Sequence, residues 1–251
     1  LPRTLRSFGQ DPDGVTAVID GPDGSETVRA RWMVACDGAK SPVREALGIG
    51  LDDFGFDEPW LVIDALVSDP SRLPAANLQI CDPARPTTCL VMSQGRHRWE
   101  FMLLPGETPE ELLDDAKIRD LLKPWNCEGV VEIERKAVYR FHGRVAQRWR
   151  EGRVLLAGDA THQTPPFAGQ GMCSGLRDVD NLAWKLAAVI RRGADPALLD
   201  SYQTEREPQV RSVIQLAITM GRVVCISDPQ AAALRDAGML AQRAAGGEAP
   251  P

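Results

Sequence analysis

The sequence lacks the features that mark several specialised classes of protein. No stretch approaches the roughly 18 to 20 consecutive apolar residues of a membrane-spanning helix, and no charged-then-apolar leader opens the chain. There are only three histidines, and the six cysteines form neither a CxxC pair nor a Cys/His cluster. These absences argue against a disulfide scaffold and against a metal site. We therefore expect reduced thiols, a cytoplasmic protein and no membrane partner.

The sequence also lacks an excess of positive charge. Lys and Arg total 29 against 35 for Asp and Glu, which gives a net charge of −6. Proteins that bind nucleic acid without sequence specificity need a basic face, so we expect no nucleic-acid partner. With 251 residues, 43% of them hydrophobic, the chain is long enough for one large core or two modest ones. This composition excludes a disordered or fibrous protein.

Hydrophobic patterns predict strands and one short helix near the N-terminus. An alternating pair of strands is expected over 14–20 and 27–31, joined by a Gly/Pro/Asp turn. The apolar run 32–36 predicts a strand buried on both faces. Ser41 as N-cap and Pro42 at the first helical position then begin a helix that ends near Leu47.

The middle of the chain reads as an antiparallel sheet. Strands are expected over 60–67, 78–81, 88–92, 98–104 and 130–139, separated by Pro/Gly/Asp-rich turns. A capping-box signature over 108–111 predicts a helix that runs to Leu122.

The last third predicts a buried strand followed by long helices. The strand is 153–157, and a helix is expected over 172–192, ending at Gly193. A stripe at three- and four-residue steps should face the core, formed by Leu176, Val179, Ala183, Leu186 and Ile190. A second helix is expected from Pro196 or Leu199 to Val224, and the Ala/Gly/Pro-rich end, 242–251, should be frayed or disordered.

The residues most informative about chemistry follow the strand 153–157. Gly158 lets a ligand approach the backbone, and the Asp159 carboxylate can accept hydrogen bonds from the hydroxyls of a ribityl or ribose chain. Further on, Gly169-Gln170-Gly171 frees backbone N–H groups where the long helix begins, so the positive end of that helix can face an electron-rich group.

These residues carry a family resemblance. The run Gly-Asp-Ala-Thr-His from Gly158, then Pro165-Pro166, Gly169-Gln170-Gly171 and the helix through Trp184-Lys185-Leu186, resembles the second FAD fingerprint of the class A flavoprotein aromatic hydroxylases. Cys36-Asp37-Gly38 and the residues to Arg44 resemble the Asp-Gly motif of that family. Within the family, the segments 98–107, 198–206 and 220–222 are most similar to those of 3-(3-hydroxyphenyl)propionate hydroxylases.

The resemblance implies an α/β (α+β) fold: a partial FAD-binding Rossmann-like domain, an inserted antiparallel-sheet substrate domain, and long C-terminal helices. The expected divisions are 1–55 and 146–225 for FAD binding, 56–145 for substrate, and 226–251 as a tail. It also implies that NAD(P)H reduces FAD and that O2 then forms a C4a-hydroperoxide, which hydroxylates a phenolic acid such as 3-(3-hydroxyphenyl)propionate. The partners would be a small aromatic substrate and O2, and the question of whether the protein forms a homo-oligomer stays open.

The resemblance assigns roles to individual residues. Asp159 would bind the ribityl hydroxyls, Pro165 would lie beside the isoalloxazine, and the backbone from Gly169 to Cys173 would approach the pyrimidine ring. Asp37 would lie near the pyrophosphate, supported by Arg44. The predicted cofactor-binding residues are Asp37, Gly38, Arg44, Ala157, Gly158, Asp159, Ala160, Pro165, Gly169, Gln170, Gly171, Met172 and Cys173. Phe167 is a substrate candidate, and no catalytic side chain and no metal ligand is assigned.

Other polar residues near these motifs have simpler interpretations. We expect His162 to be satisfied by loop backbone, Arg177, Asp178 and Asp180 to lie on a solvated or salt-bridged helix face, and Trp184 to serve packing. Arg96, Arg98, Arg140 and Arg144 are equal candidates for binding a substrate carboxylate, or plain surface charge.

One motif of the family is missing. No Gly-x-Gly-x-x-Gly with a following helix precedes the Asp-Gly motif: Gly9, Gly14, Gly21 and Gly24 lack the spacing. We therefore expect a piece of a longer enzyme that holds the flavin-ring half of the FAD site. Two alternatives stay open, a flavin oxidoreductase that does not insert oxygen and an inactive piece that acts only as a binding module.

Overall fold

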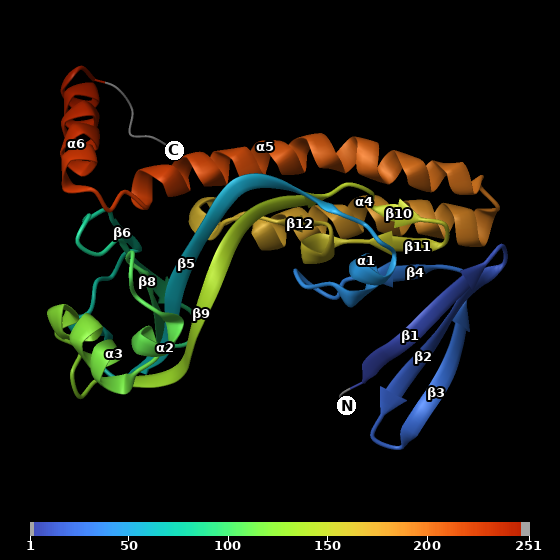
Figure 1. Ribbon diagram of the computed structural model, residues 1–251, viewed down its shortest axis with the longest axis horizontal. Helices are drawn as coiled ribbons and strands as arrows, with labels where there is room; N and C mark the ends of the chain where they lie inside the picture. The colour runs from blue at the N-terminus through green and yellow to red at the C-terminus, as the bar shows by residue number, and fades with distance from the viewer. Residues whose placement is uncertain (1–2, 247–251) are drawn as a thin grey trace. The chain divides into compact units, whose positions relative to one another are not determined.

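The computed structural model describes residues 3–246, which divide into two compact units. Unit 1 contains the residues up to Gly55 together with His142–Ala217, and unit 2 contains Phe56–Phe141 together with the residues from Ile218 onward. Strands β5 (Leu51–Val67) and β9 (Val131–Ala146) and helix α5 (Ser201–Val224) run through both units (Figure 1).

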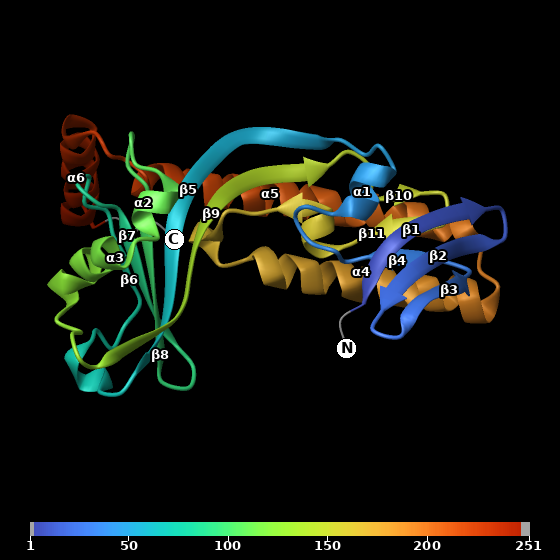
Figure 2. The same cartoon turned by 60° about the horizontal axis from the view of Figure 1, so that its bottom comes forward.

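Unit 1 begins with a three-stranded antiparallel sheet, which Figure 2 shows as one layer. The two predicted strands are confirmed as β2 (Gly14–Gly21) and β3 (Gly24–Ala30), with Gly21 opposite Gly24 at the turn. The strand β1 (Thr4–Asp11) pairs with β2 and was not predicted. The hydrophobic pattern does not predict this strand because most of its residues are exposed, which leaves little alternation of apolar and polar residues in its sequence.

A short parallel pair forms the second sheet of unit 1. Strand β4 (Met33–Ala35) pairs in parallel with β11 (Val154–Leu156), and β10 (Arg150–Glu151) pairs antiparallel with β11. All three residues of β11 are buried, as predicted. The expectation that 32–36 is buried on both faces is wrong, since Val34 is 38% exposed. Helix α1 (Pro42–Ala46) is confirmed, and the Ser41 side chain caps it by accepting from the Arg44 N–H.

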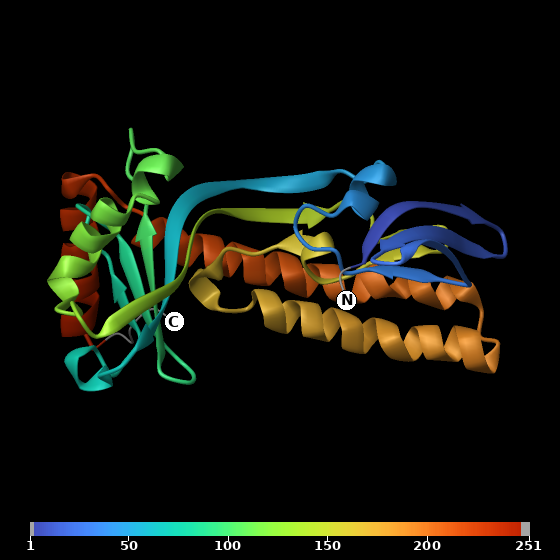
Figure 3. The same cartoon turned by 90° about the horizontal axis from the view of Figure 1, so that it is seen from below.

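Two long helices lie side by side in unit 1 (Figure 3). Helix α4 (Gly171–Arg192) ends at Gly193, whose φ of 71° is the left-handed cap that glycine favours. The 3-10 turn η5 (Pro196–Asp200) leads into α5. The predicted core stripe of α4 is wrong: Leu176 and Val179 are exposed, whereas the buried residues of this helix are Ser174, Asp178, Leu182 and Lys185.

Unit 2 is built on an antiparallel sheet in the strand order β9-β5-β8-β7-β6. The short strands are β6 (Leu78–Ile80), β7 (Thr87–Met92) and β8 (Arg96–Met102). Trp99 of β8 lies opposite Ile63 of β5 and Cys89 of β7, and these side chains belong to the apolar core. Apolar side chains of the following helices, Leu112, Ile118 and Leu122, complete that core.

The helix predicted over 108–122 is interrupted. The capping box of Thr108 and Glu111 is confirmed and begins α2 (Pro109–Leu112). Asp114 then takes an extended conformation, and its carboxylate accepts from the N–H groups of Ala116 and Lys117 to begin α3 (Asp115–Leu122). A second N-cap inside the segment therefore competes with helix continuation. The remaining 3-10 turns of unit 2 are η1 (Pro70–Arg72) and η2 (Lys123–Trp125).

The region expected as a tail from residue 226 contains helix α6 (Pro229–Ala244). Asp228 caps it and Pro229 occupies its first position. These two residues are a helix-start signal, which the prediction of a tail did not take into account. The expectation that 242–251 is frayed or disordered is wrong for 242–244, which belong to this helix, and its part beyond residue 246 falls outside the described residues. Between residues 3 and 246 no single helix is long and apolar enough to cross a membrane, and 196–224 with 229–244 meet that test only as a pair bent by 113°.

Candidate functional site

The structure brings the two sequence motifs together at one edge of the parallel pair β4–β11. Leu156 lies opposite Ala35, and the Ala157 N–H donates to the Ala35 carbonyl at 3.0 Å. Both strands therefore end side by side, and Asp37-Gly38 and Gly158-Asp159 follow those two ends. In α/β sheets the carboxyl ends of parallel strands are where ligands bind.

The first motif is shaped by its own polar groups. The Asp37 carboxylate accepts from the Val43 N–H at 3.1 Å, which links it to the N-terminus of α1. Gly38 has a φ of 86°, a left-handed conformation that suits glycine. Asp37 remains exposed despite this contact.

Arg44 ties the two motifs to each other. It is only 4% exposed, and its Nη1 donates to the carbonyls of Ala39 at 3.1 Å and Ala160 at 3.2 Å. Gln163 Nε2 also donates to Ala39, at 2.8 Å. The guanidinium predicted to support a cofactor therefore holds the loop after β4 against the turn after β11, and its contact with a cofactor stays a prediction.

The second motif forms a tight turn that leaves one carboxylate free. The 3-10 turn η3 (Gly158–Ala160) begins at Gly158, whose φ is 61°. Ala157 and Ala160 are buried, whereas Asp159 is exposed and makes no hydrogen bond to a protein group within residues 3–246. A Cβ added at Gly175 of α4 would lie 3.3 Å from the Gly158 Cα, so the turn lies directly on the helix.

The loop to α4 ends at a helix terminus without a side-chain cap. Strand β12 (His162–Gln163) pairs with β9. The turn η4 (Pro166–Ala168) follows Pro165, which is buried, and contains Phe167, which is half-buried. Gly169 has a φ of 62°, and Gln170, the N-cap of α4, makes no side-chain capping hydrogen bond, since its Oε1 accepts from the Arg177 guanidinium instead. Met172 is 76% exposed. The first N–H groups of α4, from Gly171 through Cys173, are therefore available to a ligand.

The residues present fit a flavin. Three buried polar atoms near this loop, His162 Nδ1, Thr164 Oγ1 and Ser174 Oγ, have no hydrogen-bond partner among residues 3–246. Buried polar atoms normally have partners, so orphaned ones mark a place for an external group or water. Together with the free Asp159 carboxylate and the uncapped helix, they offer acceptors for a polyol and donors for a ring carbonyl.

The four arginines considered for a substrate carboxylate already have carboxylate partners. Arg96 pairs with Glu134, Arg98 with Asp64, Arg140 with Asp57 and Arg144 with Asp53, at shortest N–O distances of 2.6 to 2.9 Å. None of them is therefore a free cation. The nearby Glu100 is 7% exposed, and burial raises its pKa, with Arg98 opposing that effect in part.

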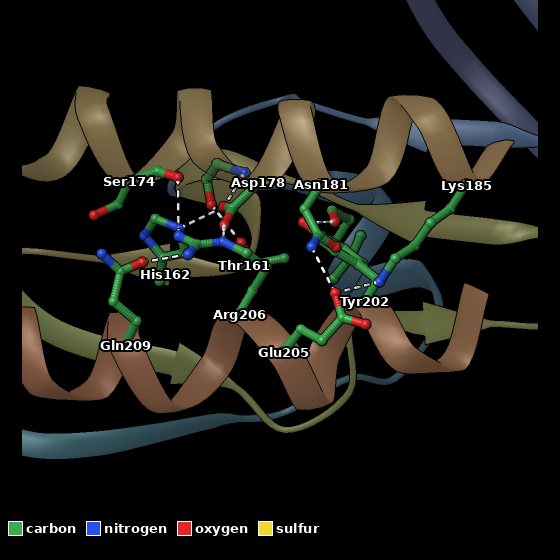
Figure 4. Close-up of polar contacts among 12 residues, drawn as sticks. Thr161, His162, Ser174, Asp178, Asn181, Lys185, Tyr202, Glu205, Arg206 and Gln209 are labelled. Carbon is green, nitrogen blue, oxygen red and sulfur yellow. Dashed lines mark hydrogen bonds and ion pairs between the residues drawn. The ribbon is translucent and has the colours of Figure 1, made fainter. Parts of the chain in front are cut away.

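Sequence reasoning missed a buried polar network behind the second motif (Figure 4). Asp178 and His162 are both fully buried, and His162 Nε2 lies 2.7 Å from Asp178 Oδ2. The expectation that loop backbone satisfies His162 is therefore wrong, and of the solvated or salt-bridged face expected for Asp178 only the salt bridge is confirmed. Asp178 also accepts from Arg206 Nε at 3.0 Å, so it is salt-bridged but internal. Its partners are far apart in sequence, and helical periodicity gives no signal for them.

Comparison with known proteins identifies the family. Residues 2–217 match the model of the FAD binding domain family, so the chain belongs to that family. It is 41% identical over 235 residues to 3-(3-hydroxy-phenyl)propionate/3-hydroxycinnamic acid hydroxylase of Mycolicibacterium smegmatis, covering 93% of this chain and 42% of that protein. It is 44% identical to a probable NADH-specific resorcinol 4-hydroxylase of Rhodococcus jostii, covering 94% and 44%.

A solved structure agrees with these relatives. Aklavinone-11 hydroxylase, determined with FAD and aklavinone, superposes with a TM-score of 0.82 at 32% identity, covering 89% of this chain and 44% of that one. The predicted family and fold class are thereby confirmed. The chain spans less than half the length of the curated relatives it matches.

Proposed function

We propose that this chain is the flavin-ring and substrate portion of an FAD-dependent aromatic monooxygenase that uses NAD(P)H and O2. The observation that carries the proposal is the meeting of the two motifs at one sheet edge, with the free Asp159 carboxylate and the uncapped end of α4 beside it. Membership of the FAD binding domain family and relatives named as aromatic hydroxylases support it.

Several of the predicted site residues have a defined role in this proposal. Asp159 accepts hydrogen bonds from ribityl hydroxyls, and Gly158 and Ala160 let the chain turn closely around them. Pro165 flanks the ring, and the N–H groups of Gly171, Met172 and Cys173 donate to its carbonyl edge. The positive end of α4 stabilises negative charge there by about 0.3 to 1 kcal/mol when exposed and up to about 2 kcal/mol when partly buried. Bound FAD would supply electron transfer from NAD(P)H and activation of O2.

The substrate portion is proposed to be the antiparallel sheet region, 56–145, acting on a phenolic acid such as 3-(3-hydroxyphenyl)propionate. Because all four candidate arginines are engaged in ion pairs, none is proposed as the carboxylate anchor. Phe167 stays the aromatic candidate for contact with substrate. The proposal includes a cytoplasmic location, which suits the six free cysteines.

Flavin titration tests the binding half of the proposal. The 251-residue chain is titrated with riboflavin, FMN and FAD, and quenching of flavin fluorescence gives each Kd. Because the sequence has no Gly-x-Gly-x-x-Gly turn for the ADP moiety, the three values should be similar. Asp159→Ala should weaken all three, since a charge-assisted hydrogen bond contributes roughly 1.5 to 3 kcal/mol, about 10- to 150-fold. Equal affinities of the variant and the wild type would refute the role of Asp159.

Turnover tests the chemical half. NADH oxidation, hydroxylated product and peroxide are measured with 3-(3-hydroxyphenyl)propionate, for the chain alone and with the N-terminal segment of a relative that carries the missing glycine motif. We expect product in step with NADH oxidation only when that segment is added. Peroxide without product would instead indicate a flavin oxidoreductase that does not insert oxygen. No NADH oxidation in either mixture would indicate a binding module.

A further inference from the structure

The carboxylate of Asp178 is shared among three elements of unit 1 (Figure 4). Its Oδ2 accepts from the backbone N–H of Gly158 at 3.3 Å and lies 2.7 Å from His162 Nε2. Its Oδ1 accepts from Arg206 Nε, on α5, at 3.0 Å. His162 Nε2 donates to Oδ2 when the imidazole carries a proton on that nitrogen.

The two oxygens of Asp178 therefore have separate tasks. Oδ1 joins α4 to α5 through Arg206. Oδ2 joins α4 to the strand-end turn, because both of its donors belong to the segment 158–162 that carries Asp159. A change at Arg206 can thus disturb the helix pair while leaving the Oδ2 contacts in place.

Arg44 holds one side of the turn through the Ala160 carbonyl, and the side that faces α4 has no side chain at its closest point of contact. Gly158 and Gly175 meet without any side chain between them, and neither residue has a Cβ that could lock the turn in position. The hydrogen bond from Gly158 to Asp178 is directional and lies next to Asp159 in sequence. Asp178 itself is fully buried, so water does not compete for its oxygens.

We propose that Asp178 is a positioning residue for the cofactor end of this chain. Its carboxylate holds the Gly158–Asp159 turn at a fixed place on α4, so that the Asp159 carboxylate and the uncapped start of the same helix face one ligand. This inference rests on the proposed flavin site. A purely structural role, in which Asp178 only joins the two helices, makes different predictions.

Glu205 supplies a matched control. It lies on α5 and accepts from fully buried Lys185 Nζ at 2.7 Å and from Asn181 Nδ2 at 2.7 Å, so it also links α4 to α5. No hydrogen bond or ion pair joins it to the segment 158–162 within the described residues. Glu205→Gln therefore disturbs the same helix pair without touching the turn.

Hydrogen–deuterium exchange on the ligand-free 251-residue chain tests the restraint directly. In Asp178→Asn, the amides of 158–162 should exchange at least about tenfold faster than in Glu205→Gln, equal to about 1.4 kcal/mol of local opening. Arg206→Lys should resemble Glu205→Gln at this segment, since it leaves Oδ2 with its donors. Equal exchange of the segment in all three variants would overturn the proposal.

Flavin titration tests the consequence. Asp178→Asn should raise the Kd for riboflavin about tenfold relative to Glu205→Gln, and an equal Kd in the two variants would overturn the proposal. If the wild type takes up no flavin, the proposed function fails for this chain, while the exchange measurement still decides the restraint.

Gly175→Ala keeps the proposal testable if Asp178→Asn does not fold. Its Cβ would press on the Gly158 Cα from 3.3 Å and displace the turn, while alanine favours the helix. We expect exchange of 158–162 at least about threefold faster and a riboflavin Kd about threefold higher, with thermal stability unchanged or higher. Wild-type values for both the exchange and the Kd would overturn the proposal.

Discussion

Arg44→Met is the substitution that best separates the structural from the sequence-based interpretation of the Asp-Gly motif. Methionine keeps an apolar stem of similar length in a site that is 4% exposed, so little packing is lost. The Ala39 carbonyl keeps its donor, Gln163 Nε2, at 2.8 Å. The Ala160 carbonyl loses the Arg44 donor at 3.2 Å, and no other hydrogen bond to it is found within residues 3–246.

The expected cost follows from that one orphaned acceptor. A buried acceptor without a partner costs about 1 to 3 kcal/mol, so we expect the free energy of unfolding to fall by roughly 2 kcal/mol. For a chain of this size that corresponds to a drop in Tm of about 4 to 8 °C. Urea unfolding and thermal melting of the ligand-free protein measure it. Lys40→Met, which removes an exposed cation four residues earlier, serves as the control for loss of charge.

The opposite result has a clear meaning. If Arg44 serves only as a supporting contact for the cofactor, as the family resemblance implies, Arg44→Met would leave the ligand-free protein as stable as Lys40→Met. A stability difference below about 0.5 kcal/mol, within the range of ordinary surface substitutions, would refute the reasoning that Arg44 ties the two motifs together.

Two carboxylates should give opposite pH dependences of stability. Hydrogen bonds from Arg85 lower the pKa of Glu107 to about 2, so its contribution is present above the ordinary carboxyl pKa and is lost as the pH falls toward 2. In urea unfolding, wild type should therefore lose stability over that acidic range relative to Glu107→Gln, and parallel curves would contradict the assignment. Burial raises the pKa of Glu100, so the folded state binds its proton more tightly than the unfolded state does. Glu100→Gln should accordingly be more stable than wild type at pH 8, and this gain in stability should shrink as the pH falls. Equal stability of the two proteins at pH 8 would contradict a raised pKa of Glu100.

Local signals in the sequence predict much of the fold. The Ser41 cap, the Thr108 capping box and the Gly193 stop depend on neighbouring residues only, and the structure confirms each of them. The meeting of Asp37-Gly38 with Gly158-Asp159 needs the parallel pairing of β4 with β11, two strands far apart in the sequence, and the pattern of each strand alone does not predict that pairing. The partners of Arg44 and His162 depend on contacts between distant segments, which pattern reasoning does not supply.

Helix α4 shows why periodicity chose the wrong face. The apolar stripe exists in its sequence, yet Leu176 is 62% exposed and Val179 is 48% exposed. The inward face carries Asp178 and Lys185 instead, and each pairs with a group of opposite charge on α5: Asp178 with buried Arg206, and Lys185 with Glu205, whose side chain is exposed. A buried charge is tolerated when it is paired and hydrogen-bonded. A hydrophobic pattern reflects only the cost of burying these charged side chains. The partners that offset this cost lie 20 to 28 residues away in the sequence. The polar face of α4 is turned inward where the proposed restraint on the Gly158–Asp159 turn lies, so the same buried carboxylate that defeats the hydrophobic pattern is the one proposed to position Asp159.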